Sequence, residues 1–231
     1  VSRNSSERVV VLGVRPVGEI HAGVRLLGDY SGIIDAMAYG ARSRKGSLRG
    51  VVVPFAVGTA YLYTDPVETT VKITDLAVES YHTELREDLK KFYIASLWAE
   101  IILASYASGS EGAEVWELMT GGLRLLSSSS QQRSDSVNLQ FLWRYLALLG
   151  MRPELPERPQ GRMVYLAREN RFAEADEVSV GGVDRDAPRE PSAISAGAIA
   201  YLSASESRTL EDALLLGLSA QQGGELKELL F

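Results

Sequence analysis

The chain has 231 residues, of which 45% are hydrophobic, and a formal net charge of -6. This length and apolar content suit one large globular domain or two small ones, each with a buried core. Cysteine is absent and there are two histidines, which excludes disulfides, thiolate metal sites and histidine-rich metal sites.

No uninterrupted apolar run approaches the roughly 18 to 20 residues that span a bilayer. The polar start, VSRNSSER, lacks the apolar core of a signal peptide. We therefore expect a cytoplasmic protein with no membrane partner.

The pattern from Arg8 to about Ser80 is entirely β. Segments rich in β-branched and aromatic residues are separated by turn residues, and we assign five strands to 8–16, 21–28, 33–40, 51–64 and 69–80. Five strands in about 70 residues predict a small closed barrel of the oligonucleotide-binding (OB) type, which presents a sheet face and loops to single strands.

A dense group of cations lies between the third and fourth predicted strands. The segment YGARSRKGSLRG (39–50) carries four of them, here called the basic cluster: Arg42, Arg44, Lys45 and Arg49. Because strand-like sequence (33–38 and 51–57) flanks the segment, we expect a loop held by a sheet at both ends. A fixed basic loop suits the phosphates of a nucleic acid, whereas the alternative is a solvated loop kept charged for solubility.

The acidic total charge does not exclude DNA. Residues 1–60 hold eight Lys or Arg against four acids, a net charge of +4, which leaves -10 for the remainder. Screening over about 8 to 10 Å makes a polyanion respond to the nearby basic face. Arg15 and Arg25, on the first two predicted strands, complete the candidate DNA-binding set.

From Glu84 the hydrophobic residues recur at steps of three and four, the spacing of a helix. A helix of about 22 residues is predicted with a buried stripe that includes Leu85 and Leu89, and Thr83 is its candidate cap. Further helices are expected at about 113–126 and 136–149, the latter ending at Gly150. A bundle follows, with one tryptophan per helix as core.

The part after Gly150 is less regular. Three prolines exclude a central strand or interior helix in 151–162. A short hairpin (163–180) and a loop (181–191) follow, then helices capped by Ser195 and by Thr209 with Asp212. Gly223 and Gly224 are expected to interrupt the last segment.

No catalytic constellation is found. Lys45, Gly46 and Ser47 are in the wrong order for a phosphate-binding P-loop. Glu19 with His21 lacks a nucleophile and is more typical of surface. We expect no enzymatic activity and no cofactor.

Several segments resemble the RecO family of DNA repair and recombination mediators. They are the run from Val10 to Phe55, with its Gly40-Ala41-Arg42 and Leu48-Arg49-Gly50 steps, the helix-like 79–102, and the terminal 194–202 and 210–230. The resemblance covers most of the chain and is strongest in its N-terminal half.

The resemblance implies an α+β protein with an OB-type domain at 1–80 and a helical domain at 81–231. It also implies binding of single- and double-stranded DNA, annealing, and, with RecR, help in loading RecA onto DNA coated by single-stranded-DNA-binding protein, whose C-terminal tail is a further partner. The basic cluster matches the family's basic loop. Many members hold zinc through four cysteines in the segment that corresponds to 151–191, and this chain departs there because it has none.

The residues that bind partner proteins do not transfer from the family, and a pocket near Trp143 and Arg144 is one candidate. An alternative function from another class is an adaptor that binds protein tails through its helical half, with a barrel that is only structural.

Overall fold

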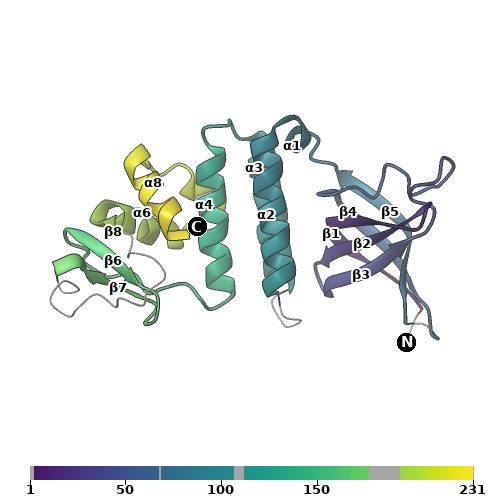
Figure 1. The fold of residues 1–231 in the computed structure, drawn as a ribbon, viewed down its shortest axis with the longest axis horizontal. Coiled ribbons are helices and arrows are strands. Elements are labelled where there is room, and N and C mark those ends of the chain that lie inside the picture. The colour runs from purple at the N-terminus through teal and green to yellow at the C-terminus, as the bar shows by residue number, and fades with distance from the viewer. Residues whose placement is uncertain (1–2, 68, 107–111, 177–192, 231) are drawn as a thin grey trace. The chain divides into compact units, whose positions relative to one another are not determined.

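The computed structural model describes residues 3–67, 69–106, 112–176 and 193–230 (Figure 1). They pack into two compact units, Val1–Gln131 and Gln132–Phe231. The first unit contains a barrel and three helices, and the second contains helices and a small sheet. The predicted domain boundary at residue 80 lies where the strands of the first unit end and its helices begin. It differs from the boundary between the two units, and it stays a prediction.

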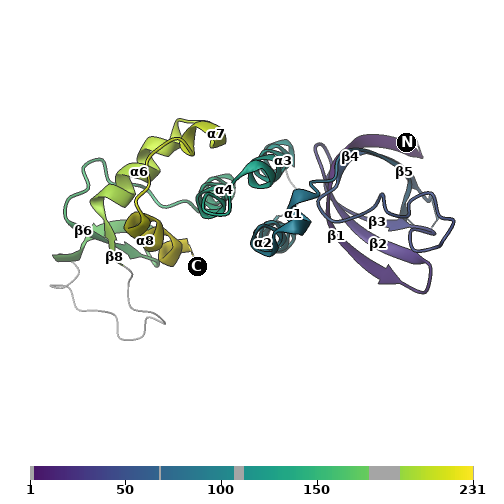
Figure 2. The same cartoon turned by 90° about the horizontal axis from the view of Figure 1, so that it is seen from above.

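The first unit is built on a closed five-stranded barrel. Neighbouring strands follow the order β1-β2-β3-β5-β4, and β1 pairs with β4 to close the barrel. The pairs are antiparallel except for β3 with β5, which run parallel. Figure 2 shows the strands curving around the interior. The strands are β1 (Asn4–Val17), β2 (His21–Gly28), β3 (Gly32–Ala38), β4 (Val57–Thr64) and β5 (Val71–Ser80). The predicted α+β fold with an N-terminal OB-type barrel is confirmed.

Aliphatic side chains fill the barrel. They come from alternate positions of each strand, because every second residue points inward. The core includes Val9, Val11, Val24, Leu26, Ile34, Ala36, Ala60, Leu62, Ile73 and Leu76. The strand predicted to begin at Val51 is wrong in its first part. Residues 51–56 form turns, and Phe55 has a φ of 67°, which is incompatible with an extended chain.

Three helices follow the barrel: α1 (Glu84–Glu87), α2 (Leu89–Ser105) and α3 (Gly112–Ser128). The single helix of 22 residues is wrong because Asp88 is extended, and its carboxylate accepts hydrogen bonds from the N–H groups of Lys90 and Lys91 at 2.9 and 3.2 Å. Asp88 is thus the cap of a new helix, whereas Thr83 makes no side-chain cap bond. Leu89, predicted to point inward, is 67% exposed.

The helices pack on one part of the barrel. Val10 and Leu27 are paired across β1 and β2, fully buried, and point away from the barrel core. The Arg8 guanidinium lies 4.3 Å from the ring centroid of Trp116 in α3, an arrangement that favours a cation–π attraction. Figure 2 shows α2 and α3 side by side, seen end-on. Arg15 lies seven residues further along β1, beyond the register shift between Val11 and Gly13.

The C-terminal end of α3 is held by two titratable side chains. The Lys91 ammonium is buried and donates to the backbone oxygens of Ser127 and Ser129 at 3.0 and 2.6 Å. His82 Nδ1 lies 3.0 Å from the Ser127 hydroxyl. The last carbonyls of a helix lack intrahelical partners and carry partial negative charge, so a cation stabilises them.

Burial lowers the pKa of His82 below its ordinary value of 6.5, and Glu84 opposes this in part. The folded state then binds the proton less readily than the unfolded state. The stability that neutral His82 contributes is present above about pH 6.5 and is lost as pH falls toward the lowered folded pKa. We expect the urea midpoint of the first unit to fall between pH 7.5 and pH 5.5.

His82→Asn is the matched control, because His82 has a φ of 45° and asparagine tolerates that conformation. The fall in the midpoint should be smaller in this variant. Equal falls in both proteins would contradict the role assigned to His82.

The second unit begins with α4 (Ser134–Leu148), which ends before Gly150 as predicted. The predicted hairpin is confirmed as β6 (Arg162–Leu166) and β7 (Arg171–Glu174), and β8 (Ala193–Ser195) adds a third strand. The second hairpin strand was predicted through residue 180, but β7 ends at Glu174, and 177–180 and the expected loop at 181–191 lie outside the described residues.

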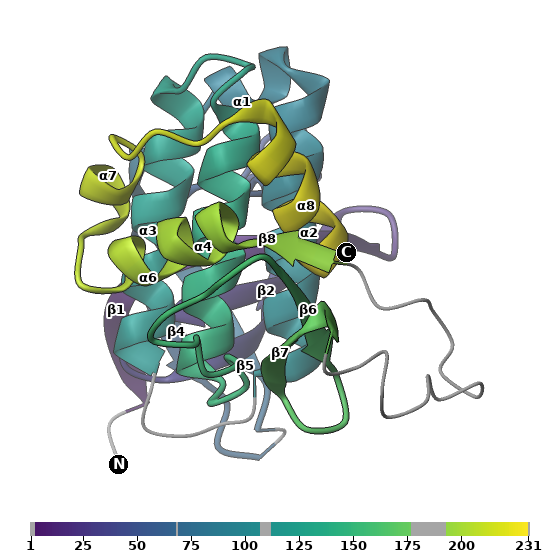
Figure 3. The ribbon, with the colours of Figure 1, turned by 90° about the vertical axis from the view of Figure 1, so that its left-hand side faces the viewer.

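The described residues of this unit include three further helices: α6 (Ala196–Glu206), α7 (Leu210–Ala213) and α8 (Ala220–Leu230). Ser195 and Thr209 cap α6 and α7 as predicted. The expected interruption at Gly223 and Gly224 is wrong, because α8 continues through both. Figure 3 shows α6 and α8 beside the small sheet, with which they share a core that contains Trp143, Ile194 and Leu202.

None of the helices in the described part of the chain is long and apolar enough to cross a membrane.

Candidate nucleic-acid interface

The segment that carries the basic cluster is a series of turns between β3 and β4. Hydrogen bonds from Ser43 N to Gly40 O (2.9 Å) and from Gly46 N to Ser43 O (3.2 Å) fold it back on itself. At Gly46 a Cβ would lie 1.9 Å from the Gly40 oxygen, so this turn requires glycine.

The segment is anchored to the barrel at several points. Leu48 and Val52 are buried in the barrel core. Arg42 N donates to Ile20 O in the β1–β2 turn at 3.0 Å. The segment's end is fixed where Phe55 N donates to Val11 O at 2.8 Å and Val11 N donates to Ala56 O at 2.9 Å. The loop is therefore held by apolar anchors and backbone bonds, although the second flanking strand is absent.

The four side chains of the basic cluster are exposed. Arg42 donates to Gly18 O at 3.3 Å and Arg49 to Arg44 O at 3.4 Å, and both acceptors are backbone oxygens. Within the residues that the structure describes, none of the four forms an ion pair with a carboxylate. The cluster thus presents its positive charge to solvent.

Arg15 and Arg25 lie on the outer face of the barrel and differ in their surroundings. Arg25 is 3.3 Å from an Asp35 oxygen, so its charge is partly compensated. Arg15 is exposed, and its side chain lies across Gly23, where an added Cβ would meet its Nε at 3.1 Å. Of these two candidates, Arg15 is the better placed for a phosphate.

His21 has a structural position in the interface. Its Nδ1 accepts a hydrogen bond from Gly40 N at 3.1 Å, and its ring contacts that of Tyr39 edge-on at 5.0 Å. It therefore holds the start of the loop.

One cation of this face was missed by sequence analysis. Lys72 of β5 is 3.0 Å from an Asp65 oxygen, and its Nζ lies 5.8 Å from the ring centroids of both Tyr39 and Tyr63. Because its neighbour Ile73 lies in the barrel core, Lys72 faces outward. The parallel β3–β5 pairing that brings it near Tyr39 has no signal in the sequence.

Arg144 and Trp143, the candidate partner pocket, have structural contacts in the second unit. The Arg144 guanidinium donates to the backbone oxygens of Ser205 and Arg208 at 3.2 and 2.9 Å, and so caps the end of α6. Trp143 is 1% exposed. Among the described residues, no group of three or more His, Cys, Asp or Glu is placed to hold a metal ion.

Comparison with known proteins matches both parts of the chain to one family. Residues 3–81 match the family described as Recombination protein O N terminal, and residues 86–231 match Recombination protein O C terminal. The chain belongs to the Recombination protein O (RecO) family. The first match covers the barrel and its basic cluster, and the second covers the helices and the small sheet.

A curated relative agrees with this family. The chain is 33% identical over 85 residues to the DNA repair protein RecO of Desulfatibacillum aliphaticivorans. The matched stretch covers 37% of this chain and 33% of the relative, so it spans about a third of the relative's length.

Proposed function

We propose that this RecO family member is a non-enzymatic mediator of DNA repair and recombination that binds single- and double-stranded DNA through the basic cluster. The observation that carries the proposal is the group of four exposed cations, without carboxylate partners in the described chain, on an anchored loop of an OB-type barrel. Family membership and the DNA repair protein RecO among its relatives support the repair role.

The physical basis of binding is release of counterions from the phosphates. An anchored loop loses little conformational freedom when it binds, so most of the attraction appears as affinity. Because the cations contact the backbone, the affinity should depend weakly on sequence, and neutralising two strands at once favours their annealing.

The proposed partners are those that the resemblance to the family implies. With RecR and the C-terminal tail of single-stranded-DNA-binding protein, the protein would help load RecA onto coated DNA. We place it in the cytoplasm with the nucleoid.

A salt titration of the purified full chain tests DNA binding. If four cations each neutralise one phosphate of a single strand, log K should fall with log salt at a slope of about -3. Fluorescence anisotropy of a labelled oligonucleotide between 50 and 300 mM salt measures this slope. A slope near zero, or no binding at 50 mM salt, would overturn the proposal.

A further inference from the structure

A row of side chains crosses the outer face of the barrel. The strand registers pair Arg15 with Gly23, Gly23 with Met37, Met37 with Lys72, and Lys72 with Tyr63. Paired residues of neighbouring strands point to the same face. Since Ala22, Ile73 and Leu62 next to them lie in the core, the row faces outward. At about 4.8 Å per strand the row is about 19 Å long.

Tyr39 lies beside this row, just after the end of β3 and before the basic cluster in sequence. It lies two residues after Met37, is 46% exposed, and comes three residues before Arg42. The Lys72 ammonium lies 5.8 Å from its ring centroid and from that of Tyr63, so one cation lies near both rings. The outer face thus brings two tyrosines and a methionine together beside the basic cluster.

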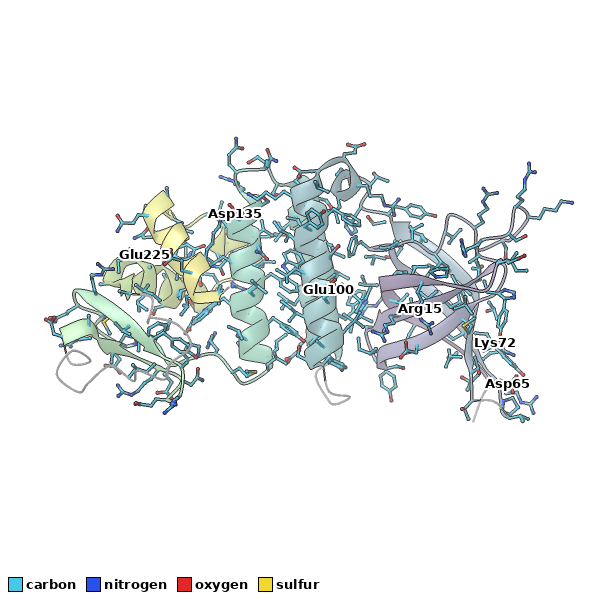
Figure 4. The ribbon with its side chains drawn as sticks, viewed as in Figure 1. Arg15, Asp65, Lys72, Glu100, Asp135 and Glu225 are labelled. Atoms are coloured by element: carbon cyan, nitrogen blue, oxygen red, sulfur yellow. The ribbon has the colours of Figure 1, made fainter. Side chains whose placement is uncertain are left out.

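Charge on this face is positive at one end and balanced at the other. Arg15 is exposed and forms no ion pair in the described chain. Lys72 is bound to Asp65, whose other oxygen accepts a hydrogen bond from Val67 N at 3.0 Å. Figure 4 shows Lys72 and Asp65 near each other on the barrel, with Arg15 on its strands.

We propose that Tyr39, Met37 and Tyr63 form a platform on which the unpaired bases of a single strand stack, while the basic cluster holds the phosphates. This proposal rests on the proposed function. The platform adds a preference for single strands, because the bases of a duplex are already stacked on each other, whereas its phosphates remain open to the basic cluster.

Nucleobases fit this surface better than an acidic peptide does. Aromatic side chains stack on any base, and cations beside them add to the attraction. A carboxylate-rich peptide would need cations without partners along the whole row, but Lys72 is already bound to Asp65. At this end Tyr39 is exposed, Met37 and Tyr63 are half-buried, and the Lys72 charge is compensated by Asp65.

Two oligonucleotides with equal charge test the platform. A thymidine 12-mer and an abasic strand with the same number of phosphates are titrated against the full chain at 100 mM salt. Stacking on two rings, each contributing about tenfold, predicts about 100-fold tighter binding of the thymidine strand. Equal binding of the two strands would overturn the platform and leave the proposed function intact, whereas no binding of either would overturn both.

Substitutions assign the effect to the two rings. Tyr39→Leu with Tyr63→Leu should weaken thymidine binding about 100-fold and change abasic binding less than twofold. The control is Tyr30→Leu, since Tyr30 is 91% exposed in the β2–β3 turn, at the other end of β3. It should leave both affinities unchanged. A double variant that binds thymidine as the wild type does, with an unchanged melting temperature, would contradict the proposal. So would an equal loss for both strands.

Discussion

Replacing the whole basic cluster with alanine is expected to lower affinity for a single-stranded oligonucleotide by about 10² to 10³-fold at 0.1 M salt. Each neutralised phosphate contributes about 0.7 to the slope of log K against log salt, so four contribute about 2.8. At 0.1 M salt this equals about 2.8 decades of affinity. The slope itself should rise from about -3 to near zero. Fluorescence anisotropy over a salt series measures both quantities.

A charge-preserving variant is the matched control. Arg42→Lys, Arg44→Lys and Arg49→Lys together keep four positive charges, and the slope should stay within about half a unit of wild type, since counterion release depends on charge. The alanine variant should still fold, because Leu48, Val52 and backbone hydrogen bonds anchor the loop. An alanine variant that kept both slope and affinity would exclude the cluster as the DNA contact.

Much of the barrel could be predicted from the sequence. Segments rich in β-branched and aromatic residues, separated by turn residues, located five strands, and β2 was found with its observed bounds. The helix expected at about 113–126 and the caps of α6 and α7 were also correct, because each depends on local sequence. Helical period and capping chemistry act over a few residues, so they are readable without the fold.

The errors have physical causes that act through space. The residues of VVVPFAV (51–57) favour β structure, which predicts a strand, yet Val52 is an apolar anchor in the barrel core and Phe55 has a positive φ. Leu89 matched a helical stripe, but Asp88 starts a new helix and leaves Leu89 exposed. In α8, tertiary packing of Leu226 outweighs the helix-breaking tendency of two glycines.

The candidate site likewise has a part that the sequence predicts and a part that only the fold brings together. The basic cluster was visible because its residues are contiguous in sequence. The Tyr39–Lys72–Tyr63 group was not, since it depends on β3 and β5 lying in parallel register. Likewise the compensation of Arg25 by Asp35 follows from the β2–β3 pairing.

Lys91→Met is expected to destabilise the first unit by about 3 kcal/mol. Methionine keeps the apolar stem but removes the ammonium, which leaves the oxygens of Ser127 and Ser129 without the buried donor that they share. An unsatisfied buried acceptor costs about 1 to 3 kcal/mol, and loss of the cation at a helix C-terminus adds about 0.3 to 2 kcal/mol. Loss of protection against hydrogen exchange in α2 and α3 measures this cost.

Hydrogen exchange reads the two units separately. A loss of about 3 kcal/mol should speed exchange of the most protected amides of α2 and α3 about 100-fold, while β6 in the second unit serves as an internal reference. Lys45→Met removes the same charge from an exposed position and should change these rates less than about twofold. If α3 exchanged equally slowly in Lys91→Met, the ammonium would not be what holds the end of that helix to α2.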